Sequence, residues 1–141
     1  MGSPVSDGMC VDWDVPVPMD DGVTLRADVF SPSAAGHYPV LLSYGPYAKG
    51  LAFQDGYPSA WQRMVAEHPD VACGSSNRYQ NWEVVDPEKW VPDGYVCVRV
   101  GPAARAARPA SLIISRRARR AIFTRASNGL ACRAGRTGTS A

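Results

Sequence analysis

The sequence YVCVRV, residues 95–100, follows an Asp93-Gly94 turn and forms a short apolar run. A similar run, YPVLLSY, occupies residues 38–44 and ends at Gly45-Pro46. Short continuous apolar runs are typical of strands that are buried on both faces of a sheet. Because a helix and loops are expected between these two runs, we predict an α/β layer that contains both strands.

Further toward the N-terminus, the sequence predicts two antiparallel strands at the edge of this layer. Residues 11–17 form a mixed apolar run, and the sequence Asp20-Asp21-Gly22 then supplies a tight turn, because glycine tolerates a positive φ. Residues 23–30, VTLRADVF, alternate in polarity and are rich in β-branched side chains. Together these segments predict a β-hairpin.

The segment between the two apolar runs predicts one short helix and a long loop. Trp61, Met64 and Val65 have the spacing of one helix face, and Ser59 is the candidate N-cap. Residues 69–92 contain glycine, asparagine, proline and three aromatic residues, which favours a loop.

The charge of the chain is divided unevenly along its 141 residues. Residues 1–100 contain all 13 acidic residues and 6 basic ones, whereas residues 101–141 contain 9 arginines and no acidic residue. No apolar run reaches the roughly 18 residues of a membrane-spanning helix, and the N-terminus has no signal-peptide pattern. The four cysteines show no CxxC pairing, so we expect separate thiols, no metal site and a cytoplasmic location.

Three ordered segments resemble the N-terminal part of the CocE/NonD hydrolases, which include cocaine esterase, α-amino-acid ester hydrolases and Xaa-Pro dipeptidyl-peptidases. They are VPMDDGVTLRADVF at residues 17–30, completed by Pro32; YPVLL followed by GPYAK at residues 38–49; and WVPDGYVCVRV at residues 90–100. The resemblance implies that residues 1–100 are the N-terminal part of an incomplete α/β-hydrolase sheet, with its antiparallel edge hairpin and first parallel strands.

The same resemblance implies serine-hydrolase chemistry without a metal or an organic cofactor. In this family a Ser-His-Asp triad cleaves small ester or peptide substrates through an acyl-enzyme. Tyr47, in the PYxK position of the resemblance, would supply an oxyanion-hole hydroxyl. A phenol donor on a fixed loop suits this role, because it can meet charge that develops only in the transition state.

The triad itself has no counterpart in the sequence, which contains no G-x-S-x-G. Ser75 and Ser76 lie in a polar loop and are interpreted as linker serines, and His37 and His68 as solvated residues. The family's Ser, Asp and His would all follow residue 100. We therefore expect the chain itself to be inactive.

Our hypothesis for the tail is a change of reading frame near residue 100. The test starts from the peptide Asp-Ser-Arg-Gly-Ala-Gly-Arg-Ser-Pro-Gly, written in GC-rich codons. When these codons are read one base later, they encode Thr-Pro-Ala-Ala-Arg-Ala-Ala-Arg-Pro-Ala. The last nine residues of this second peptide are identical to residues 102–110 of the chain. We therefore expect residues 101–141 to be a frameshifted, disordered Arg/Ala-rich tail. Without a following strand, we expect the strand at 95–100 to lose a neighbour and leave an open apolar edge.

The alternative is a small non-enzymatic protein with a selected basic arm. The cluster RRARR at residues 116–120 lies beside apolar residues and could bind nucleic acid or an anionic membrane. No aromatic interleaving or base-reading motif supports specific recognition of nucleic acid, so the hydrolase interpretation is preferred.

Overall fold

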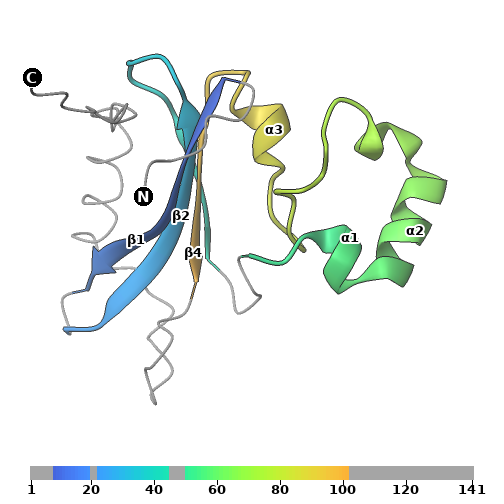
Figure 1. The fold of residues 1–141 in the computed structure, drawn as a ribbon, viewed down its shortest axis with the longest axis horizontal. Helices are drawn as coiled ribbons and strands as arrows, with labels where there is room; N and C mark the ends of the chain where they lie inside the picture. Colours follow the sequence, from blue (N-terminus) through green and yellow to red (C-terminus); the bar gives the residue numbers. More distant parts are fainter. Residues whose placement is uncertain (1–7, 20–21, 45–49, 102–141) are drawn as a thin grey trace, which may run out of the picture.

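The computed structural model describes residues 8–19, 22–44 and 50–101. Its four strands form one sheet in the order β1-β2-β4-β3 (Figure 1). The strands are β1 (Met9–Pro18), β2 (Thr24–Pro32), β3 (Val40–Tyr44) and β4 (Val96–Gly101). β1 and β2 pair in antiparallel orientation, β2 and β4 likewise, and β3 and β4 in parallel. The predicted mixed sheet with an antiparallel hairpin at its edge is confirmed.

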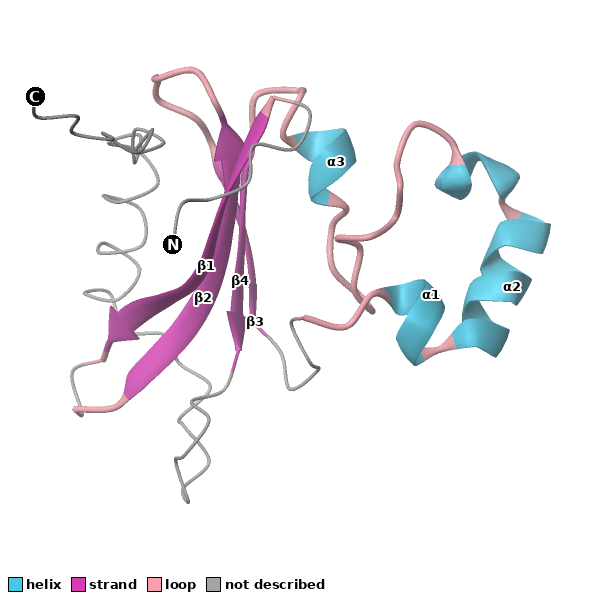
Figure 2. Cartoon of the chain, in the orientation of Figure 1, coloured by secondary structure: helices cyan, strands magenta, loops and turns pink. Residues whose placement is uncertain are grey.

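The described helices all lie between β3 and β4 in the sequence and on one side of the sheet (Figure 2). They are α1 (Phe53–Gly56), α2 (Pro58–Glu67), the 3-10 helix η1 (Pro69–Ala72) and α3 (Pro87–Trp90). The predicted helix corresponds to α2, but Ser59 is not its N-cap. Tyr57 holds that position without a side-chain hydrogen bond, and Pro58 begins the helix because its fixed φ suits the first turn.

The predicted loop at residues 69–92 also contains more structure than expected, because η1 and α3 fall within it. Both begin with proline. In α3 the Asp86 carboxylate is the N-cap and accepts a hydrogen bond from the Glu88 backbone N–H at 3.1 Å. The local signal was therefore an Asp-Pro pair, which caps and starts a helix of a single turn.

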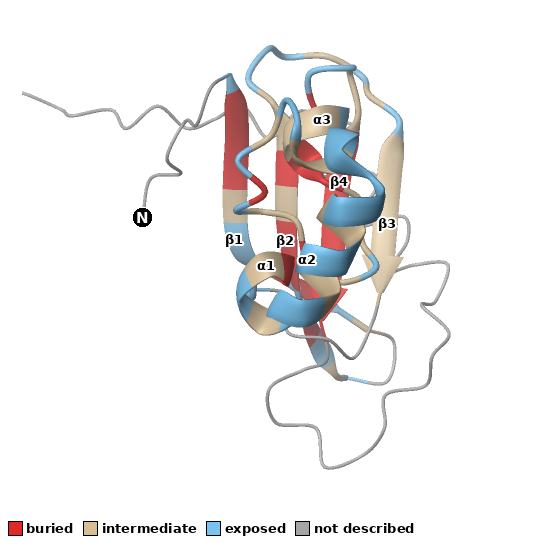
Figure 3. Ribbon diagram, turned by 90° about the vertical axis from the view of Figure 1, so that its right-hand side faces the viewer, coloured by how far each residue is buried: buried red, intermediate tan, exposed pale blue. Residues whose placement is uncertain are grey.

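β4 is the buried centre of the sheet, and all six of its residues are buried (Figure 3). Val96, Val98 and Val100 pack in one apolar cluster with Leu25 of β2. Cys97, which points to the opposite face, packs in a second cluster with Phe30. The continuous apolar run at 95–100 reflects this burial on both faces.

Two expectations about these strands are wrong. The strand at 95–100 has not lost a neighbour, because β2 returns in antiparallel orientation and takes the side of β4 that β3 leaves free. Conversely, β3 is only half-buried at each of its five positions. Within the described part of the chain β3 pairs only with β4, so β3 is one edge strand of the sheet and β1 is the other.

The connection from η1 to α3 is tied together by the Glu88 carboxylate. It accepts hydrogen bonds from the Ser75 hydroxyl at 2.7 Å, from the Ser76 backbone N–H at 2.8 Å and from the Ser76 hydroxyl at 2.8 Å. Burial of Glu88 raises its pKa, but the hydrogen bonds outweigh this effect, so the pKa lies below its ordinary value. The predicted linker serines therefore hold the loop in place.

We predict that Leu25→Ala lowers the free energy of unfolding by about 2–5 kcal/mol, because it leaves a cavity in the sheet core. Leu25 is 1% exposed, whereas Leu51 is 44% exposed. The matched change Leu51→Ala should cost less than about 0.5 kcal/mol. Urea titration followed by circular dichroism measures both, and equal losses would contradict this packing.

We also predict a pH dependence that belongs to Glu88. Because its pKa is lower in the folded chain, the unfolded chain binds the proton first, and stability falls as the pH drops from the ordinary value through the folded-state pKa. Glu88→Gln should remove this part of the acid loss and should also lower stability at pH 7. Glu67→Gln, at an exposed position in α2, is the control; urea titrations between pH 3 and 7 that show equal slopes for Glu88→Gln and the unmodified chain would contradict the prediction.

Candidate active-site edge

The carboxyl ends of β3 and β4 lie at the same edge of the sheet, because the two strands are parallel and Tyr44 pairs with Val100. In open α/β sheets, ligands bind outside the carboxyl ends of parallel strands. The segment that follows β3 contains Tyr47, three residues beyond Tyr44. Tyr47 itself lies outside the described residues, so its predicted role remains a prediction. We define the carboxyl ends of β3 and β4 as the candidate active-site edge.

Arg99 lies two residues before this edge and is only 4% exposed. Its Nη2 donates hydrogen bonds to the backbone carbonyl of Tyr79 and, at 3.3 Å, to that of Val85. The guanidinium carbon lies 4.8 Å from the centroid of the Phe30 ring, a cation–π distance. One side chain of β4 therefore fixes the 79–85 loop against the sheet.

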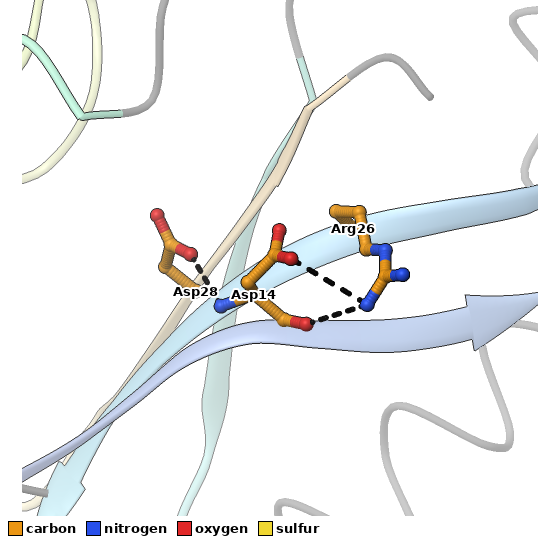
Figure 4. Close-up of polar contacts among 3 residues, drawn as sticks. All are labelled: Asp14, Arg26 and Asp28. Carbon is orange, nitrogen blue, oxygen red and sulfur yellow. Dashed lines mark hydrogen bonds and ion pairs between the residues drawn. The ribbon is translucent and has the colours of Figure 1, made fainter. Parts of the chain in front are cut away.

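Asp28 of β2 lies opposite Arg99 in the strand register and is 1% exposed. Its Oδ1 accepts a hydrogen bond from the Asp14 backbone N–H at 2.9 Å (Figure 4). Asp14 lies within the irregularity of β1 and has a φ of 56°. Arg26 donates to the Asp14 carbonyl at 3.1 Å and forms an ion pair with its carboxylate at 3.5 Å. Asp28 thus links the bulge of the hairpin to the strand that carries Arg99.

The charges of this region follow from burial. Burial lowers the pKa of Arg99 to about 10, while nearby groups, including Cys97, Asp28 and Asp86, raise it. Arg99 therefore remains positive at neutral pH. Burial raises the pKa of Cys97 to about 11, so its thiol stays protonated and is unsuited to act as a nucleophile.

The other predicted residues do not converge on the edge. His37 and His68 are exposed, as expected for solvated residues. Cys73 is exposed and Cys97 is buried, and neither of these two forms a disulfide. Cys132 lies outside the described residues.

Over residues 8–19, 22–44 and 50–101, no group of three or more His, Cys, Asp or Glu side chains could hold a metal ion. Among the same residues, no helix has the length and apolar character needed to cross a bilayer.

Sequence reasoning missed the roles of Arg99 and Asp28. The available signal was a single charged residue inside an otherwise apolar run, YVCVRV. A charge at a position buried on both faces requires a partner, which the matching strand had to supply.

The comparisons with known proteins agree with the three sequence motifs. Residues 21–106, more than half of the chain, match the family model of the X-Pro dipeptidyl-peptidase, S15 family. No curated protein sequence matches the chain.

Two solved structures of a CocE/NonD family hydrolase from Staphylococcus aureus share 33% identity at a TM-score of 0.47, covering 65% of this chain and 15% of that one. An α-amino acid ester hydrolase shares 16% identity at a TM-score of 0.38, covering 75% of this chain and 14% of that one. The chain thus spans about 15% of the length of these hydrolases. The family match over residues 21–106 places the chain in the S15 X-Pro dipeptidyl-peptidase family of hydrolases, the group that includes the CocE/NonD enzymes.

Proposed function

We propose that residues 1–100 are the N-terminal part of a serine hydrolase domain that cleaves ester or amide bonds, releasing an acyl group or an Xaa-Pro dipeptide. The observation that carries this proposal is the family match over residues 21–106. It includes both parallel strands and the candidate active-site edge. The substrate is a small ester or peptide, and the parent enzyme is cytoplasmic.

In the proposed reaction the serine hydroxyl of the parent enzyme attacks the substrate carbonyl while the histidine takes its proton. The tetrahedral oxyanion then collapses to an acyl-enzyme, and the histidine returns the proton to the leaving alcohol or amine. Water attacks the acyl-enzyme in the same way, which releases the acid and restores the serine. No metal or organic cofactor takes part in these steps.

The role of this chain in that reaction is to present Tyr47. The Tyr47 hydroxyl donates a hydrogen bond to the carbonyl oxygen as it becomes negative, and this bond is strongest in the transition state. The parallel register of Tyr44 with Val100 supports this role, because the segment with Tyr47 leaves the sheet at the edge where ligands bind in such folds.

We further propose that a reading-frame change separates residues 1–100 from the rest of the hydrolase. The family match ends at residue 106, within the first residues of the arginine-rich tail. The printed sequence contains no G-x-S-x-G, and the buried Cys97 thiol offers no substitute nucleophile. The chain as printed is therefore inactive.

A serine-directed fluorophosphonate probe tests this proposal. The chain itself should remain unlabelled. A frame-restored chain is translated from the same gene with the reading frame after codon 100 shifted to the one that encodes Asp-Ser-Arg-Gly. This frame-restored chain should be labelled at one serine. Labelling of the chain itself would contradict the proposal. So would an unlabelled frame-restored chain whose far-UV spectrum shows that it is folded.

In the frame-restored chain, Tyr47→Phe should lower kcat by roughly 10²–10³-fold, the loss typical of one missing oxyanion-hole donor, with little change in KM. Tyr44→Phe, three residues earlier on half-buried β3, is the matched control and should retain kcat. Steady-state hydrolysis of p-nitrophenyl esters measures both variants. Equal kcat values for the two would exclude Tyr47 from the oxyanion hole.

A further inference from the structure

Four buried polar atoms lack a hydrogen-bond partner, and all belong to Arg99 or to the loop that it holds. Over residues 8–19, 22–44 and 50–101, these side-chain atoms are Arg99 Nε, Asp86 Oδ2, Asn77 Oδ1 and Gln80 Oε1. Buried polar groups in folded proteins are almost always paired, either with the protein or with an ordered water. Their restriction to one loop and one side chain indicates a local cause.

Two of these atoms, Arg99 Nε and Asp86 Oδ2, belong to charged side chains, for which an unpaired buried atom costs more than it does for a neutral amide. Arg99 is 4% exposed and Asp86 is 6% exposed, so both are shielded from bulk water. Each is also held through another atom. Arg99 Nη2 donates to the carbonyls of Tyr79 and Val85, and Asp86 Oδ1 accepts from the Glu88 backbone N–H at 3.1 Å. Neither side chain can turn toward a new partner without disturbing these contacts.

The two side chains lie in the same buried region. The Val85 carbonyl, which accepts from Arg99 Nη2 at 3.3 Å, belongs to the peptide group that joins Val85 to Asp86. Burial lowers the pKa of Arg99 to about 10, and Asp86 is among the nearby groups that raise it. An unpaired donor and an unpaired acceptor are therefore brought together beside one peptide group.

The charges of this region restrict what can bind between the two atoms. The Arg99 guanidinium would repel a cation, and the Asp86 carboxylate would repel an anion. A neutral molecule that only accepts hydrogen bonds would leave Asp86 Oδ2 unpaired, and one that only donates would leave Arg99 Nε unpaired. The ligand must therefore be neutral and must both donate and accept. Water is the smallest molecule of this kind and needs the least room.

We propose that Arg99 Nε and Asp86 Oδ2 hold one ordered water molecule, which accepts a hydrogen bond from the Nε–H and donates one to the carboxylate oxygen. This water links the central strand β4 to the carboxylate that caps α3. The inference does not rest on the proposed function, because it concerns residues that are all present in the chain as printed.

Proton NMR of the full chain, with arginine labelled with nitrogen-15, tests the proposal at the Arg99 Nε–H. A water held there should give a nuclear Overhauser cross-peak between this proton and the water resonance, with the sign expected for a molecule that tumbles with the protein. Arg26 is exposed and serves as the control, because its Nε–H should show only chemical exchange with bulk water. A cross-peak that is absent at Arg99, or that shows only exchange, would overturn the proposal.

Asp86→Ser tests the other partner of the water. Serine keeps an N-cap hydroxyl for the Glu88 N–H but has no second oxygen to receive the water. The Overhauser cross-peak of Arg99 should be lost, and exchange of its Nε–H with solvent should accelerate by roughly tenfold or more. Asp70→Ser, at an exposed position in the first turn of η1, is the matched control and should change neither observation. A cross-peak that persists in Asp86→Ser would contradict the assignment, and the measurement on the unmodified chain decides alone if this variant does not fold.

Titration of the unmodified chain with sodium chloride distinguishes a water from an ion. A neutral ligand predicts that the Arg99 Nε–H resonance shifts no more than that of Arg26 as the salt concentration rises. A saturating shift confined to Arg99 would identify a bound ion and overturn the proposal.

Discussion

A guanidinium buried on the central strand is the constraint on which the described structure depends. Removing a charged side chain from water costs several kcal/mol, and hydrogen bonds, nearby opposite charges and aromatic contacts offset part of this cost. Arg99 has carbonyl acceptors for its Nη2 in the 79–85 loop, an aromatic ring beneath it and Asp28 opposite it, while its buried Nε has no hydrogen-bond partner among the described residues. The hairpin and the loop are consequently held against β4, and displacing either of them would take partners away from the buried charge of Arg99.

That arrangement determines where chemistry can occur. β2 covers one side of β4, so the parallel partner β3 must lie on the other side, and both parallel strands end at the candidate active-site edge. The helices between β3 and β4 lie on one side of the sheet, and α1 is tied to the loop through Phe53 and Gln80.

The sequence predicted the elements whose signal is local and missed those that depend on distant partners. Alternation in VTLRADVF and the apolar run in YVCVRV were sufficient to predict β2 and β4. The predicted full burial of β3 failed, because neighbours across a sheet decide burial. Ser59 failed as an N-cap because Pro58 starts α2 one residue earlier. The Arg99–Asp28 register depends on strand pairing over 71 positions of sequence, which no local pattern reveals.

The measurement that tests the central claim most directly is the genomic DNA sequence from codon 95 to beyond the stop codon. If residues 1–100 are the N-terminal part of a serine hydrolase, the alternative frame should encode Asp-Ser-Arg-Gly at codon 101 onward, and a G-x-S-x-G further downstream. The claim is contradicted if the DNA confirms the reading frame that encodes residues 101–141 and neither alternative frame encodes either motif. The arginine-rich tail would then be the part of the chain in which to look for function.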